Sequence, residues 1–86
     1  MSTKELVEVI VKALVDHPEQ VEVREIEGAQ SSMIEIRVAP EDQGQIIGRK
    51  GWNIGALRTI ASAASKKNRK KVILDVIEEQ KGRELE

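Results

Sequence analysis

The core of this chain has to be built almost entirely from aliphatic side chains. The 86 residues include no Phe, no Tyr and no Cys, and Trp52 is the single aromatic residue. A chain of this size buries only somewhat more than about 60% of its unfolded surface, so it supports one modest core. The absence of cysteine excludes a disulfide, a thiolate nucleophile and a zinc–cysteine site. We therefore expect one small domain with an aliphatic core.

Charged residues are segregated along the chain, although the net charge is only −1. Residues 1–42 carry four basic and ten acidic residues, a balance of −6. Residues 43–71 carry eight basic residues and no acidic one, a balance of +8, and residues 72–86 carry two basic and five acidic ones, a balance of −3. The middle block concentrates positive potential on one part of the surface. It is compatible with an anionic partner and also with plain solvation of a helix face.

We expect a cytoplasmic protein without a membrane segment. No uninterrupted apolar run approaches the ~20 residues of a membrane span. The first residues, MSTKELVE, mix acidic side chains into the apolar ones, unlike a secretory signal.

Hydrophobic periodicity predicts the element order α-β-β-α-α-β. Ser2-x-x-Glu5 has capping-box spacing and opens a helix that ends before Pro18. Alternation slips near Glu25, which indicates a bulge or a strand end. The expected elements are the opening helix, a strand over 21–26, a turn over 27–32, a strand over 33–38, a short helix from Pro40 to Ile47, a helix over 52–67 and a strand over 72–77.

This order predicts an α+β fold. The last two strands are joined by helices and can lie parallel, with a right-handed crossover. Residues 1–78 are expected to form the single domain, and residues 79–86 a polar C-terminal tail.

Two glycines bracket two cations at the junction of the last two helices, in the sequence Gly48-Arg49-Lys50-Gly51. Glycine permits a sharp reversal of the chain and a close approach of a ligand. The start of the next helix favours a phosphate group. The spacing fits neither a P-loop nor a dinucleotide fingerprint. Taken alone, however, a G-x-x-G segment is weak evidence and is also typical of an ordinary turn.

The stretch IIGRKGWNIGALR, residues 46–58, resembles the signature of KH domains, in which a G-x-x-G loop between two helices clamps four nucleotides through their backbone. The element order matches the type II arrangement of that fold, which implies a three-stranded mixed sheet with its helices packed on one face. Over residues 3–78 the layout is similar to the KhpA family of small single-domain bacterial KH proteins. The resemblance implies single-stranded RNA binding without a cofactor, low-specificity RNA chaperone activity and a link to cell shape. It also implies a homodimer or a heterodimer with a second KH-containing protein.

The resemblance also assigns residues to the RNA site. Gly48, Arg49, Lys50 and Gly51 would form the backbone clamp. Apolar residues on either side of the loop would floor the groove and hold its helices together, and the strand containing Ile36 to Val38 would form the opposing wall. Beside the clamp, the expected RNA-binding residues are Ile47, Trp52, Asn53, Arg58, Ile36, Arg37 and Val38.

Trp52 departs from the family, which commonly has a small polar or basic residue at this position. It falls roughly 150° from the centre of the apolar stripe of its helix, so it is expected to point away from the core. A base stacked on it would contribute about 1–3 kcal/mol. Covering a hydrophobic edge, or filling a dimer interface, where Trp is enriched, is an equally open role for this residue.

Catalysis and metal binding are not expected. His17 is the only histidine and is predicted to cap a helix end, and no nucleophile and base stand in a recognisable arrangement. Two functions therefore remain, an RNA-binding module and a protein-interaction adaptor with little RNA affinity. The basic residues between 66 and 71 are assigned first to solvation and helix termination and only second to RNA contact: Lys66, Lys67, Arg69, Lys70 and Lys71.

Overall fold

The structure, a computed structural model, describes residues 1–77, and the expected tail over 79–86 lies outside the described residues. Its helices and strands confirm the predicted order α-β-β-α-α-β. Short 3-10 turns at Pro18–Gln20, Pro40–Asp42, Arg49–Gly51 and Lys66–Asn68 connect several of these elements. The helices and strands are α1 (Thr3–Leu14), β1 (Glu22–Glu27), β2 (Ser31–Arg37), α2 (Gln43–Ile47), α3 (Trp52–Ser65) and β3 (Lys71–Val76).

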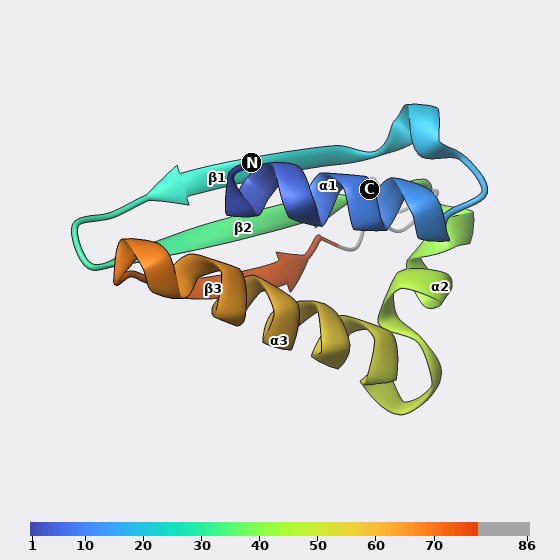
Figure 1. Ribbon diagram of the computed structural model, residues 1–86. Coiled ribbons are helices and arrows are strands. Elements are labelled where there is room, and N and C mark those ends of the chain that lie inside the picture. Colours follow the sequence, from blue (N-terminus) through green and yellow to red (C-terminus); the bar gives the residue numbers. More distant parts are fainter. Residues whose placement is uncertain (78–86) are drawn as a thin grey trace, which may run out of the picture.

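The three strands form one mixed sheet in the order β1-β2-β3. β1 pairs antiparallel with β2, and β2 pairs parallel with β3, so the central strand is β2. α1 and α3 lie over the same face of this sheet, which confirms the expected α+β architecture (Figure 1). The G-x-x-G loop lies at one end of the molecule, and the turn from α3 into β3 lies at the opposite end.

Two local expectations about the first hairpin are wrong. The register between β1 and β2 runs without interruption through the pairs Glu25↔Ile34 and Ile26↔Met33, so there is no bulge near Glu25. The alternation slips because Ile26 lies on the outer face of the sheet, where it is 50% exposed. The turn is also shorter than expected, because Ser31 and Ser32 already belong to β2.

The core is aliphatic, as the composition requires, and lies between the helices and the inner face of the sheet. Alternate residues of β2 are buried, and α1 contributes Val7 and Val11, both 0% exposed. The start of α1 is fixed by the predicted capping box: the Ser2 hydroxyl accepts a hydrogen bond from the Glu5 N–H at 3.1 Å. The buried hydrophobic cluster comprises Val7, Val11, Val15, Val23, Ile34, Ile36, Val38, Ile46, Ile54, Leu57, Ala61 and Leu74.

A polar contact joins the end of α1 to the start of α2. Asp42 is 1% exposed, and its Oδ2 accepts a hydrogen bond from the His17 backbone N–H at 3.0 Å and lies 3.1 Å from His17 Nδ1. The predicted capping role of His17 is therefore wrong, because its side chain makes no cap hydrogen bond. A buried carboxylate needs such partners, since an unpaired one is strongly destabilising.

The contact shifts both pKa values. The hydrogen bond to Asp42 raises the pKa of His17 above its ordinary value of 6.5, against a smaller effect of desolvation. Burial alone raises the pKa of Asp42, but hydrogen bonds from His17 and from the Asp16 backbone outweigh it, and the net pKa lies below 3.8. Protonated His17 thus stabilises the fold below pH 6.5, and this contribution is lost as the pH rises through the raised pKa. Ionised Asp42 contributes above pH 3.8, and its contribution is lost as the pH falls through the lowered pKa.

We predict that His17→Ala destabilises the protein more at about pH 5.5 than at about pH 8.5, because only the protonated imidazole carries the full interaction with Asp42. The measurement is urea unfolding of both proteins at each pH. An equal loss of unfolding free energy at the two pH values would show that the His17 charge contributes nothing to the fold.

Candidate nucleic-acid interface

The backbone of the G-x-x-G loop adopts conformations that favour glycine. Gly48 has φ 77° and ψ 171°, a combination that is essentially restricted to glycine, and Gly51 is left-handed at φ 76° and ψ 17°. Lys50 is also left-handed, at φ 56° and ψ 22°. Three residues with positive φ within four positions reverse the chain sharply between α2 and α3. As a result the exposed side chains of Arg49 and Lys50 project from the reversal.

Asn53 holds this reversal closed from the first turn of α3. Its Nδ2 donates a hydrogen bond to the Gln45 carbonyl in α2 at 2.8 Å. A Cβ placed on Gly48 would lie 2.7 Å from Asn53 Cγ, so Asn53 occupies the space that any other residue would need. The RNA contact expected of Asn53 stays a prediction, and in this structure its amide nitrogen fixes the position of α2 relative to α3.

The expected strand wall of the groove is wrong. Ile36 is 0% exposed and Val38 is 6% exposed, because β2 is the central strand and this side of it faces the helices. Arg37 alternates with them and therefore lies on the outer face of the sheet, away from the helix layer. Ile47, by contrast, is half-buried and packs against the core beside the loop.

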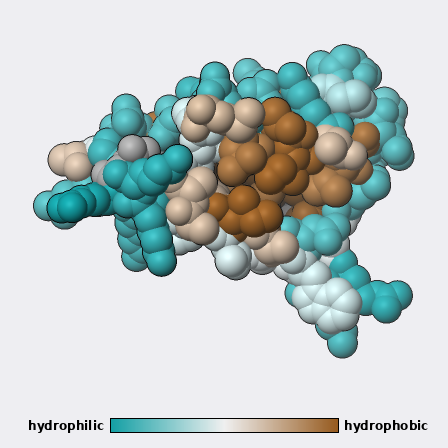
Figure 2. All heavy atoms as spheres, viewed as in Figure 1, coloured by the Kyte–Doolittle hydropathy of each residue, from teal (hydrophilic) through white to brown (hydrophobic). Residues whose placement is uncertain are grey.

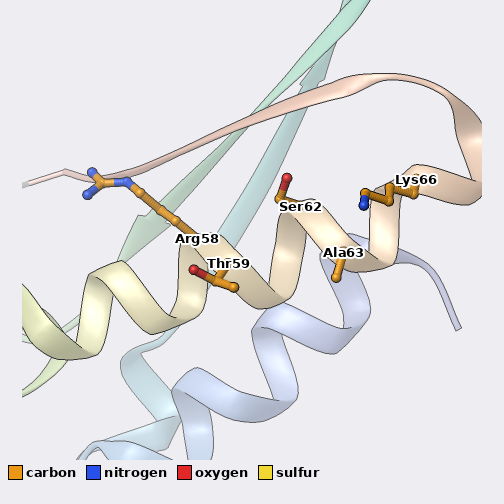
Figure 3. A pocket seen from close by; sticks show the side chains of 5 residues that line it. All are labelled: Arg58, Thr59, Ser62, Ala63 and Lys66. Carbon is orange, nitrogen blue, oxygen red and sulfur yellow. The ribbon is translucent and has the colours of Figure 1, made fainter.

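The surface hollows lie instead between α3 and the edge strand β3. One open hollow of about 410 Å³ is lined by α3 and by Lys66, the residue that directly follows it, with Arg58 extending toward β3 (Figure 3). A second hollow of about 420 Å³ shares Arg58 and Ser62 and continues onto β3. The first hollow is lined by Arg58, Thr59, Ser62, Ala63 and Lys66. The second is lined by Arg58, Ser62, Val72, Ile73, Leu74 and Asp75.

Arg58 connects the two walls of this groove. Its Nε donates a hydrogen bond to the Leu74 carbonyl of β3 at 3.1 Å. Because that bond uses Nε, the two terminal NH₂ groups of the guanidinium lie beyond it and are suited to a phosphate. Sequence reasoning selected Arg58 but missed Thr59, Ser62 and the β3 residues. The available signal was the polar flank of α3, with Thr59, Ser62 and Lys66 at helical spacing.

Trp52 is the first residue of α3 and directly follows the loop. It is 66% exposed, which confirms that it points away from the core. No carboxylate occurs from residue 43 to residue 71, so the loop and α3 present only positive charges. An anion approaching this end of the molecule therefore meets mobile cations, an exposed indole and a helix start together.

Other kinds of site are not found in the described part of the chain. Residues 1–77 hold no group of three or more His, Cys, Asp or Glu side chains placed to share a metal ion. Within the same residues, no helix is both long enough and apolar enough to cross a membrane.

The glycine geometry predicts a ranked effect of alanine substitution. Gly48→Ala should destabilise by about 1–3 kcal/mol through backbone strain alone, with a further loss as Asn53 is displaced. Gly51→Ala should cost about 1–2 kcal/mol, since the left-handed conformation is its main obstacle. Gly55→Ala lies in α3 with nothing within 4 Å of its new Cβ, and should stabilise by up to about 1 kcal/mol. Chemical denaturation measures all three, and equal losses for Gly48 and Gly51 would contradict the role given to Asn53.

Comparison with known proteins places the chain in a family. The family model described as KhpA/KhpB, KH domain matches residues 4–76. The RNA-binding protein KhpA of Caldanaerobacter subterraneus subsp. tengcongensis is 53% identical over 73 residues, covering 85% of this chain and 97% of that protein. The RNA-binding protein KhpA of Clostridium perfringens is 49% identical over 74 residues, covering 86% and 99%.

Among solved structures, a crystal structure of Aquifex aeolicus Era bound to GDP and aluminium fluoride is similar in fold, with a TM-score of 0.65 and 17% identity. The likeness covers 90% of this chain and 31% of the Era chain. The family match and the identities to KhpA span most of the chain and agree with the fold and the G-x-x-G reversal, and on this evidence the chain belongs to the KhpA/KhpB family of KH domains.

Proposed function

We propose that this chain is a non-enzymatic module that binds single-stranded RNA in the cytoplasm through the G-x-x-G loop and the groove between α3 and β3. The observation that carries the proposal is the loop itself, where Arg49 and Lys50 are exposed between two positive-φ glycines at the start of α3. The relatives that match most of the chain bear the name RNA-binding protein KhpA, which supports the same function.

The chemistry of the surface fits a chain of nucleotides rather than a compact ligand. Phosphates would lie against the loop and the start of α3, where backbone N–H groups and cations converge. Bases would lie in the groove, with Trp52 as a stacking surface at its entrance and the aliphatic part of β3 as the far wall. Such contacts read few base edges, so we infer weak sequence preference and a low-specificity chaperone role.

The first test is titration of Trp52 fluorescence with short single-stranded RNA at two salt concentrations. We expect quenching that weakens as the salt concentration rises, because phosphate contacts release counterions. The double variant Arg49→Asp with Lys50→Asp should abolish binding and leave the fold intact, since both side chains are exposed. The matched control, Lys4→Asp with Lys71→Asp, changes the net charge equally at positions away from the loop and should retain most of the affinity.

Two other outcomes carry a different conclusion. Binding that survives the change at Arg49 and Lys50 would move the RNA site away from the loop. No binding of RNA at low salt, by fluorescence or by polarisation, would favour the alternative function, a protein-interaction adaptor on a KH scaffold.

We further propose that the helix layer supplies a contact with a second copy of the chain or with a second KH-containing protein. Apolar side chains gather over α1 and α3 on this face (Figure 2). The exposed large aliphatic residues on these helices include Val9 at 55% and Ile60 at 42%. A single weak RNA module would gain affinity from such pairing through effective concentration.

Ile60→Glu should shift the purified protein to a monomer in sedimentation velocity, because it puts a charge into the apolar patch. Ile73→Glu is the matched control, since Ile73 is 44% exposed on the outer face of the sheet and should leave association unchanged. A shift caused by Ile73→Glu alone would place the contact on the sheet. If the wild-type protein is monomeric at all concentrations, the homodimer is excluded and only the heterodimer remains. That alternative is tested by adding the second KH-containing protein to the sedimentation experiment.

A further inference from the structure

Lys66 differs in its position from Lys70 and Lys71, two of the cations that follow it. It lines the hollow on α3 together with Arg58, Thr59, Ser62 and Ala63 (Figure 3). Lys70, in contrast, forms an ion pair with Glu27 at 3.2 Å. Lys71 is in register with Ser31 and alternates with the inward-facing Val72 and Leu74, so it lies on the outer face of the sheet. Lys66 therefore faces the groove, whereas Lys70 and Lys71 do not.

Lys66 also shares one stripe of α3 with the G-x-x-G end of the helix. Trp52, Thr59 and Lys66 are spaced by seven residues, so each lies within about 20° of the previous one around the helix. A helical rise of 1.5 Å per residue places Lys66 about 21 Å from Trp52 along the axis. Between them the exposed flank carries small side chains, and a Cβ on Gly55 would meet nothing within 4 Å. An extended chain can therefore lie along the helix without obstruction.

The charges along this track favour an anion on the helix side of the groove. Residues 43–71 contain no carboxylate, so no acidic side chain of α3 interrupts the stripe. The one carboxylate that lines the groove, Asp75, belongs to the β3 side of the second hollow. Asp75 alternates with the inward-facing Leu74 and Val76, so its side chain, like that of Lys71, lies on the outer face of the sheet, away from the α3 side of the groove.

We propose that Lys66 is a second phosphate-binding residue, so that the RNA site runs along α3 from the G-x-x-G loop at one end of the molecule to the turn before β3 at the other (Figure 1). The inference rests on the proposed RNA-binding function and adds to it a minimum length of RNA. Four nucleotides at the loop fill only the first part of the site. Occupying both ends requires a longer strand.

The test compares Lys66→Ala with Lys71→Ala, which remove the same charge from the groove and from the outer face of the sheet. Each variant and the wild type are titrated with a single-stranded tetranucleotide and with a strand of about ten nucleotides, within the range of site sizes known for small single-strand binding folds. Affinities are measured by fluorescence polarisation over a series of salt concentrations.

We expect the wild type to bind the longer strand more tightly than the tetranucleotide. The gain should exceed the statistical factor that arises because a longer strand offers more positions for a four-nucleotide site. Lys66→Ala should weaken binding of the longer strand several-fold and reduce the slope of log K against log salt by about 0.7, the value for one phosphate contact on a single strand. It should leave tetranucleotide binding unchanged, and Lys71→Ala should have little effect on either strand.

Two results would contradict the inference, and they distinguish a failure of the proposed function from a failure of the role given to Lys66. If the wild type binds neither strand at low salt, the proposed function fails and the inference fails with it. If the wild type binds both strands but Lys66→Ala and Lys71→Ala change affinity and salt slope equally, RNA binding stands and Lys66 acts only through bulk charge. Thermal unfolding of both variants checks that Lys66 does not act by stabilising the end of α3, where a cation also favours the helix dipole.

Discussion

The reversal of the chain between α2 and α3 is the constraint on which the rest of this structure depends. Gly48 reaches a backbone conformation closed to other residues, and Asn53 fills the space beside it while its amide holds the Gln45 carbonyl. The reversal allows Ile46 and Ile54, which are 0% and 6% exposed, to enter the same core from consecutive helices. It also leaves Arg49 and Lys50 outside that core. Packing and charge presentation are therefore two results of one local geometry.

The parallel pairing of β2 and β3 decides where a ligand groove can form. A parallel connection needs a crossover, and here the crossover is formed by α2, the loop and α3. α3 then covers the sheet on its way to the edge strand, and the polar flank of the helix faces the open side of β3. Arg58 joins the two through the Leu74 carbonyl. The groove thus lies at the sheet edge rather than over the central strand, which the helices bury.

The aliphatic composition has a further consequence for the surface. Aliphatic side chains fill the core of this 86-residue chain, but the helix layer leaves Val9 and Ile60 partly exposed. The loop end carries cations and an indole, whereas this patch is apolar, so the two surfaces suit partners of different chemistry. An RNA contact and a protein contact can therefore exist on one small domain without competing for the same side chains.

The sequence by itself determined the element order, the mixed sheet, the capping box at Ser2 and the outward position of Trp52, because periodicity and capping are local properties. The G-x-x-G reversal was also readable, since glycine spacing reports on backbone conformation directly. The tertiary structure alone decided three other features. It buried Ile36 and Val38, because strand order is set by pairing between distant segments. It brought Asp42 to His17 across 25 positions. It also separated Lys66 from Lys71, since the turn after α3 sends one toward the groove and the other to the far face of the sheet.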